Sequence, residues 1–172
     1  PTKTLHAAAH LFESAAAAQG GGASGSLALD AAGLFDHKRH VVAALEGGIE
    51  KLLKGRKVEV IRGRGRLAGP DAVEVEGHGT LRAKSVLVAT GSSEVPLPAA
   101  DFDGKRILGS TDLLELDRVP RSMLVVGGGV IGCEFASIFN AFGVKVTIVE
   151  MLPSLVATED RHVVRFLQAA LK

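Results

Sequence analysis

A glycine-rich stretch between two apolar runs is the part of this 172-residue sequence whose spacing most clearly indicates chemistry. Residues 124–126 lead into Gly127-Gly128-Gly129-Val130-Ile131-Gly132, and a second apolar run, residues 144–149, is followed by Glu150. Glycines at the first, third and sixth positions allow a tight turn, close approach of a ligand to the backbone, and close packing of a helix on a sheet. Because the amides at the start of such a helix favour anions, the pattern predicts a pyrophosphate site.

Glu150 predicts which dinucleotide binds there. A carboxylate at the end of the second strand can accept hydrogen bonds from the adenosine ribose hydroxyls, and it repels a 2′-phosphate. The next residues are Met151, Leu152 and Pro153, so no neighbouring arginine would neutralise that phosphate. The sequence therefore predicts NAD rather than NADP. The alternative is a glycine-rich loop in an unrelated parallel sheet.

Two other groups of polar residues could bind ligands. His6 and His10 share a helical face, but no third ligand lies at an expected spacing, so we predict a helix face and no metal site. Arg62, Arg64 and Arg66 alternate and would share one face of a strand. That face could be a patch for phosphate or an acidic partner, although a solvated sheet surface is the simpler interpretation.

The composition limits the remaining classes of function. Hydrophobic residues make up 47% and charged residues 23%, which is typical of a globular domain. A net charge of +1 and the absence of Tyr and Trp argue against nucleic-acid binding. No run approaches the roughly eighteen apolar residues of a membrane span, and no signal peptide is recognisable at the start. A single cysteine excludes an internal disulfide framework and suits a reducing compartment.

The elements that would position these residues alternate between helix and strand. Helical spacing predicts helices over residues 4–18 and 35–54, a short helical linker over 113–120, and the start of another helix over 160–172. Apolar runs between glycines, prolines and aspartates predict a small meander, with strands at residues 58–62, 65–67, 72–76, 79–82 and 85–89. The last of these stops at Thr90-Gly91-Ser92, where a ligand could lie against bare backbone.

Taken together, these pieces resemble the pyridine nucleotide:disulfide oxidoreductase family, most closely its dihydrolipoamide dehydrogenase branch, over essentially all 172 residues. Pro1-Thr2-Lys3-Thr4-Leu5 resembles the continuation of the family's redox-cysteine motif. The other similar stretches are residues 45–49 with 63–65, residues 88–92 with Pro96 and Pro98, and residues 119–150.

The resemblance implies an α/β fold with two partial Rossmann-like, three-layer domains and a small antiparallel β-meander. Residues 1–115 would be part of an FAD-binding domain without its amino-terminal βαβ unit and redox cysteines. Residues 116–172 would begin an NAD-binding domain, and the family's interface domain would be absent. Because Pro1 is not an initiator Met, we expect this chain to be an interior segment of a longer protein. Since each cofactor domain would be present only in part, its strands would have open edges, and we expect the isolated segment to aggregate or stay partly unfolded.

The resemblance also assigns roles to matching positions. Lys3 would lie beside the flavin and form a buried charge pair with Glu134. FAD would contact Lys3, Gly65, Thr90, Gly91 and Ser92. NAD would contact Gly127, Gly128, Gly129, Val130, Ile131, Gly132, Cys133, Glu134 and Glu150. Val130, where related reductases often have Tyr, favours the lipoamide branch. Cys133 would pack as a small buried group, and no residue of this segment would be catalytic.

The implied reaction passes electrons from dihydrolipoamide through a disulfide and FAD to NAD, giving lipoamide and NADH. The parent enzyme would be a homodimer within a 2-oxoacid dehydrogenase or glycine cleavage complex, in the cytoplasm or the mitochondrial matrix. The segment alone would be inactive. Two alternatives stay open: another family member of the mercuric reductase, glutathione reductase or transhydrogenase type, and a non-catalytic NAD-binding module.

Overall fold

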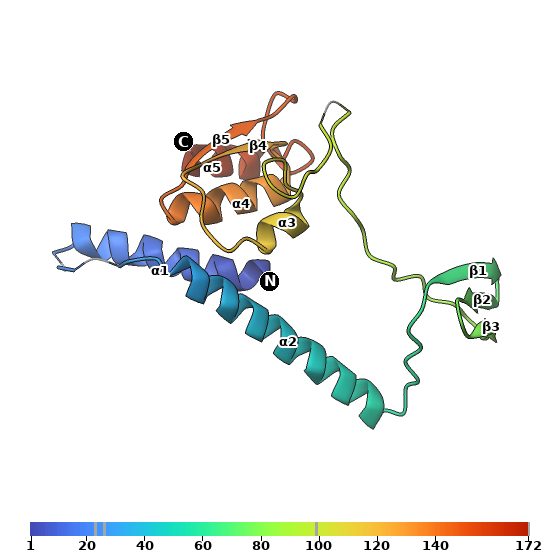
Figure 1. The fold of residues 1–172 in the computed structure, drawn as a ribbon. Helices are drawn as coiled ribbons and strands as arrows, with labels where there is room; N and C mark the ends of the chain where they lie inside the picture. Colours follow the sequence, from blue (N-terminus) through green and yellow to red (C-terminus); the bar gives the residue numbers. More distant parts are fainter. Residues whose placement is uncertain (23, 26, 99, 172) are drawn as a thin grey trace. The chain divides into compact units, whose positions relative to one another are not determined.

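The computed structural model describes residues 1–22, 24–25, 27–98 and 100–171, and the chain forms two compact units (Figure 1). Unit 1 comprises Pro1–Ala44 and Pro96–Lys172, and unit 2 comprises Leu45–Val95. Helix α2, Ala31–Gly55, runs from the first unit into the second. The predicted domain boundary between residues 115 and 116 stays a prediction.

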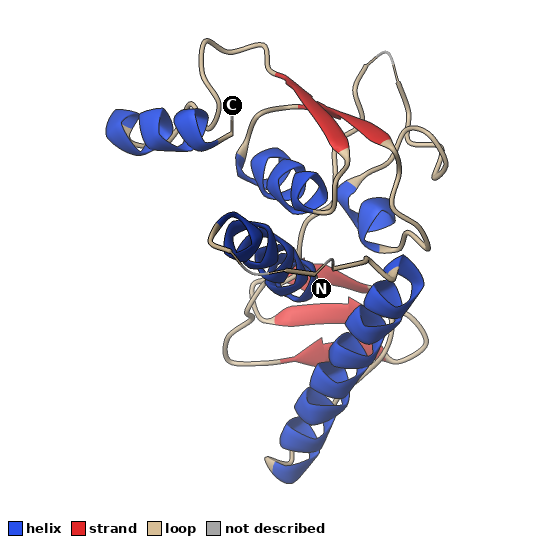
Figure 2. Ribbon diagram, turned by 90° about the vertical axis from the view of Figure 1, so that its left-hand side faces the viewer, coloured by secondary structure: helices blue, strands red, loops and turns tan. Residues whose placement is uncertain are grey.

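A β-α-β segment forms the nucleotide-motif part of unit 1. Strand β4, Ser122–Val126, pairs in parallel with β5, Lys145–Val149, and helix α4, Val130–Ala141, connects them. The register places Met123 beside Val146 and Val126 beside Val149. Both strands thus end at the same edge, next to the glycine turn, as the sequence predicted. Figure 2 shows the two strands with helices beside them.

The core of unit 1 is built where the first helix packs against α4. Helix α1, Thr2–Gly20, supplies the fully buried Leu5, and α4 supplies Ile138 and Phe139. Phe35 of α2 and Leu113 of α3, Ser110–Leu114, join the same cluster. Helix α5, Arg161–Ala170, begins at Asp160, whose side chain accepts hydrogen bonds from the amides of residues 162 and 163. Apolar burial at helical spacing therefore holds α1 to α4.

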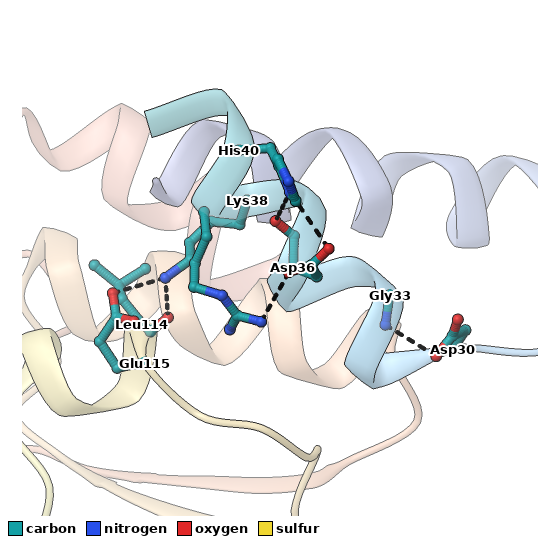
Figure 3. A network of polar contacts seen from close by, with 8 residues as sticks. Asp30, Gly33, Asp36, Lys38, His40, Leu114 and Glu115 are labelled. Carbon is teal, nitrogen blue, oxygen red and sulfur yellow. Dashed lines mark hydrogen bonds and ion pairs between the residues drawn. The ribbon is translucent and has the colours of Figure 1, made fainter. Parts of the chain in front are cut away.

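Lys38 connects α2 to the end of α3 (Figure 3). Its side chain is 1% exposed, and its Nζ donates to the Leu114 carbonyl oxygen at 2.8 Å and to Glu115 Oε1 at 2.7 Å. The Leu114 carbonyl lies in the last turn of a helix, where a cation is favoured. The bond joins residues 76 positions apart in the sequence, so this buried ammonium fixes the first part of α2 to the remainder of unit 1.

Unit 2 contains the meander that the sequence predicted. Strands β1, Gly65–Gly69, β2, Ala72–Val75, and β3, Gly79–Arg82, form an antiparallel sheet in that order. Exposed ion pairs connect its residues: Arg66 of β1 with Glu74 of β2 at 2.8 Å, and Arg82 of β3 with Asp71 of the β1–β2 turn at 3.1 Å. Ala72 and Val75 are its buried side chains. The sheet is small, as expected for a meander with short turns.

Two of the predicted strands are wrong. Residues 58–62 and 85–89 are extended but pair with no other strand in the described part of the chain. Val58 and Val60 are 49% and 55% exposed, and Leu87 is 90% exposed. An apolar, β-branched run gives strand propensity, but a strand also needs a partner for its backbone hydrogen bonds.

Helix ends also differ from the predictions. The linker helix is α3 at residues 110–114, so it overlaps the predicted 113–120 at only its last two residues. Its N-terminus is fixed by Asp112, whose carboxylate accepts the Gly109 amide at 3.0 Å. Helix α5 ends at residue 170, and the predicted end at residue 172 lies outside the described residues.

The fold class is confirmed: helices combine with a parallel strand pair and a small antiparallel sheet. Among the described residues, no helix has the length and apolar character needed to cross a membrane.

Candidate nucleotide-binding site

The glycine turn after β4 is shaped by backbone contacts that side chains would block. Gly127 has φ +109, a conformation that favours glycine, and its amide donates to the Val149 carbonyl at 2.8 Å. A Cβ at Gly132 would overlap the carbonyl oxygen of Gly127 and lie 3.2 Å from Val125 Cγ1. The first and last glycines therefore have the turn and packing roles that the spacing predicted.

Gly129 lies on the open side of the turn. It is the N-cap of α4, with φ −72 and ψ −179, and a Cβ built on it would meet nothing within 4 Å. The first amides of a helix have no acceptor within the helix, so those at the start of α4 can bind an anion. Val130 and Ile131, which follow, are 55% and 61% exposed. A ligand can thus reach the backbone here.

Glu150 folds back onto the turn from the end of β5. Its Oε2 accepts the Gly128 amide at 2.6 Å, and its Oε1 accepts the Leu152 amide at 2.7 Å. The amide of Leu152 and then that of Gly128 lower the pKa of this carboxyl below its ordinary value. The side chain is therefore a carboxylate beside the turn, as acceptance of ribose hydroxyls requires.

Cys133 is buried in the first turn of α4. It is 5% exposed, and its Sγ donates to the Gly128 carbonyl oxygen at 3.4 Å. Burial, and then the charge of Glu150, raise the pKa of the thiol. The prediction of a small buried group is confirmed, and a thiol held in its protonated form is a poor nucleophile.

The residues predicted to bind FAD fall in both units. Lys3 is exposed on α1 in unit 1. Gly65 begins β1 in unit 2, where it lines an open pocket with Arg64 and Glu76. Thr90, Gly91 and Ser92 are exposed in the extended segment of unit 2, and Gly91 has φ +74. Their roles toward FAD stay predictions.

The predicted buried pair between Lys3 and Glu134 is not present in this structure. Both residues are exposed, and the ion pairs found in the described part of the chain do not include this one. Their helices, α1 and α4, do pack against each other. Two exposed charges gain little from pairing, because surface ion pairs contribute about 0–1 kcal/mol.

The other two polar groups have structural explanations. His10 Nδ1 lies 3.2 Å from Ser14 Oγ on the exposed side of α1, and no cluster of three metal-ligating side chains occurs among the described residues. Arg62 donates to Glu50 at 2.6 Å and Arg66 to Glu74 at 2.8 Å, all with exposed side chains. These pairs favour the solvated-surface interpretation of the arginines.

Two residues that the sequence did not single out lie against the turn. Val156 is buried, has φ +41, and donates its amide to the Gly128 carbonyl oxygen at 2.7 Å. Leu155 fills the space that a Cβ on Gly128 would need. Nothing in the sequence pattern identifies these positions, because a left-handed valine is rare.

The turn fits a dinucleotide on the evidence of its own geometry. It combines an open Gly129 at the start of α4, a close contact between Gly132 and Gly127, and an ionised Glu150 at the end of the second strand. The strand-turn-helix-strand arrangement is the one that places a pyrophosphate at a helix N-terminus and a ribose beside an acidic residue.

The family model described as "Pyridine nucleotide-disulphide oxidoreductase" matches residues 1–172. The chain is 41% identical over 180 residues to dihydrolipoyl dehydrogenase 3 of Pseudomonas aeruginosa, covering 99% of this chain and 38% of that protein. It is 35% identical over 178 residues to a dihydrolipoyl dehydrogenase of Bacillus subtilis, covering 100% of this chain and 39% of that protein. The chain thus spans about two fifths of the length of these curated relatives.

Solved structures agree with these matches. LpdA from Mycobacterium tuberculosis superposes with a TM-score of 0.85 at 30% identity, covering 99% of this chain and 39% of that one. The HOCl-induced flavoprotein disulfide reductase RclA from Escherichia coli gives a TM-score of 0.74 at 26% identity, covering 99% and 36%.

Proposed function

The chain belongs to the pyridine nucleotide-disulphide oxidoreductase family, and from this premise we propose that it supplies the NAD-binding turn of a dihydrolipoyl dehydrogenase. FAD and NAD are the cofactors of this family. The observation that carries the proposal is the β4–α4–β5 segment, in which an open helix start lies beside the ionised Glu150. The names of the curated relatives support the choice of branch.

Each part of the turn has a distinct role in holding NAD. The open backbone at Gly129 and the first amides of α4 would bind the pyrophosphate, because they offer unpaired donors at the positive end of a helix. Glu150 would accept the adenosine ribose hydroxyls, and the amides that lower the pKa of its carboxyl favour the ionised form that accepts them. The same charge would exclude a 2′-phosphate.

The redox chemistry would be supplied by FAD and NAD when they are bound, and the protein would orient them. This chain contains one cysteine, which is buried with a raised pKa. A disulfide therefore cannot form among these 172 residues. We accordingly expect no turnover of dihydrolipoamide by the chain alone. Lys3, Gly65 and residues 90–92 are the candidates for contact with FAD.

The proposed substrate and partners of the whole protein follow from its assignment to the dihydrolipoyl dehydrogenase branch. We propose dihydrolipoamide as the electron donor, assembly as a homodimer, and membership of a 2-oxoacid dehydrogenase or glycine cleavage complex. A cytoplasmic or mitochondrial-matrix location accords with the bacterial and mitochondrial relatives. The predicted division into an FAD part, residues 1–115, and an NAD part, residues 116–172, belongs to the same proposal.

Titration of the full-length protein that contains this chain with NADH and NADPH tests the nucleotide assignment. We expect NADH to bind at least about tenfold more tightly. Glu150→Gln removes the charge but keeps the shape of the side chain. It should therefore lower the affinity for NADH and raise the affinity for NADPH, which reduces the preference. Glu13→Gln, on an exposed residue of α1, is the control. Equal affinity for the two nucleotides in the unaltered protein would contradict the proposal.

A further inference from the structure

Gly128 is enclosed by the segment that follows β5, although the motif leaves its position variable. A Cβ on Gly128 would overlap Leu155 Cδ2 and would lie 3.2 Å from both Cβ and Oε2 of Glu150. Any side chain at position 128 would therefore displace the Leu155 side chain and crowd that of Glu150. We refer to residues 150–156 as the strap.

The strap also uses both polar groups of Gly128. The amide donates to Glu150 Oε2 at 2.6 Å, and the carbonyl oxygen accepts the Val156 amide at 2.7 Å. Cys133 Sγ lies 3.4 Å from the same oxygen. The two ends of the strap, Glu150 and Val156, thus hold opposite ends of one residue of the turn.

The strap keeps this position at the expense of backbone strain. Val156 has φ +41, which is a genuine outlier for a β-branched side chain. Such a conformation persists only where the surroundings impose it. Val156 is 6% exposed and packs with Cys133 and Val164, and Leu155 borders the same cluster. This packing holds the strained residue in place.

The amides at the turn therefore fall into two groups, one already hydrogen-bonded and one available to a ligand. The Gly128 amide is occupied by a carboxylate, whereas the amides at the start of α4 have no acceptor within the helix. An incoming pyrophosphate is therefore directed to Gly129 and α4, away from the negative charge beside Gly128. This choice of amides by the pyrophosphate depends on Gly128 staying where the strap holds it.

We propose that Leu155 and Val156 are positioning residues for NAD: they fix the Gly128 peptide so that the pyrophosphate meets only the amides at the start of α4. This inference rests on the proposed function, because it concerns the same turn. Neither residue needs to touch the nucleotide.

A matched pair of truncations separates positioning from packing. Leu155 and Leu167 are both half-buried leucines beside the same cluster, but only Leu155 lies against Gly128. In the full-length protein, under conditions where both variants are folded, we expect Leu155→Ala to weaken NADH binding by about tenfold and Leu167→Ala to leave it unchanged. Leu155→Met, which restores the volume, should recover most of the affinity. If Leu155→Ala does not fold, Leu155→Val and Leu167→Val are compared in the same way.

A double-substitution cycle tests the contact itself. Gly128→Ala should weaken NADH binding strongly in the unaltered protein, and much less in the Leu155→Ala background, where the overlapping group is gone. Equal losses in the two backgrounds, or equal affinities of Leu155→Ala and Leu167→Ala, would overturn the inference. Failure of the unaltered protein to bind NADH would instead overturn the proposed function on which it rests.

Discussion

The glycine turn of unit 1 and the extended segment of unit 2 were both predicted to bind nucleotides, but they differ in how they are supported. At the turn, β4 and β5 pair with each other, α4 contacts both strands, and the strap encloses Gly128. Residues 85–92 have no strand partner in the described part of the chain, and Leu87 is 90% exposed.

This difference shows what a sequence motif can build by itself. The strand-turn-helix-strand motif contains a strand partner for one edge of each of its strands, since β4 and β5 pair with each other. The segment ending at Thr90-Gly91-Ser92 carries the apolar residues of a buried strand, but its hydrogen bonds depend on a partner at a distance in sequence. The turn is therefore the part of the proposed function that these 172 residues support most fully.

The largest expected effect compares one aliphatic side chain from each region. Ile138 on α4 is 1% exposed, whereas Leu87 is 90% exposed. Ile138→Ala should destabilise the protein by about 4 kcal/mol, and Leu87→Ala by less than about 0.5 kcal/mol. Urea unfolding measures both. A large loss with Leu87→Ala would show that the extended segment is covered in solution, and the contrast between the regions would fail.

A second pair of substitutions compares two glycines within the turn. Gly132→Ala places a Cβ against the Gly127 carbonyl, so it should cost about 3 kcal/mol and abolish NADH binding. Gly129→Ala has space for its Cβ and should cost about 1 kcal/mol, yet it should weaken binding because the backbone is covered. Thermal unfolding with NADH titration distinguishes the two. If both variants bound NADH normally, the turn would not be the site.

Lys38 tests whether the first part of α2 belongs to the same folded unit as the turn. Lys38→Met keeps the packed stem but removes the bonds to Leu114 and Glu115, so we expect a loss of about 2 kcal/mol. Glu115 is 60% exposed, and Glu115→Gln should cost less than about 1 kcal/mol. Urea denaturation of both variants gives the comparison. Equal and negligible losses would mean that α2 is not anchored there.

The smallest expected effect is a pH dependence in the segment that returns the chain to unit 1. Asp103 Oδ1 accepts the amides of Ile107, Lys105 and Arg106 at 2.7–2.8 Å, which lowers its pKa to about 2 from an ordinary 3.8. Because the folded state holds the proton less tightly, the stabilisation is complete above pH 3.8 and is lost as the pH falls towards 2.

Asp103→Asn provides the check on that dependence. The difference in urea midpoint between this variant and the unaltered protein should be constant from pH 7 to about 5 and should shrink towards pH 2. A difference that stayed constant down to pH 2 would show that the carboxylate is not held by these amides.

The features predicted correctly from the sequence are those set by local patterns. The glycine turn, the helix after it and the three-stranded meander follow from glycine positions and apolar spacing within short stretches. The burial of Cys133 follows from its place on the inner face of α4. In each case the residues that decide the structure are neighbours in the sequence.

The features that sequence reasoning missed depend on contacts between distant residues. The Lys38 bond to Leu114 joins α2 to α3, and the strap holds Gly128 through a left-handed Val156 that its residue type disfavours. The Lys3–Glu134 pair, which the family resemblance implied, is not formed in this structure, where both side chains are exposed. Such contacts require the folded structure.

Hydrogen exchange of the full-length protein that contains this chain, with and without NADH, tests the central claim most directly. We expect NADH to slow the exchange of amides in residues 127–133 and 150–156, and to leave residues 85–92 exchanging as fast as before. Protection confined to residues 85–92, or no change at the glycine turn under saturating NADH, would contradict the assignment of the nucleotide site.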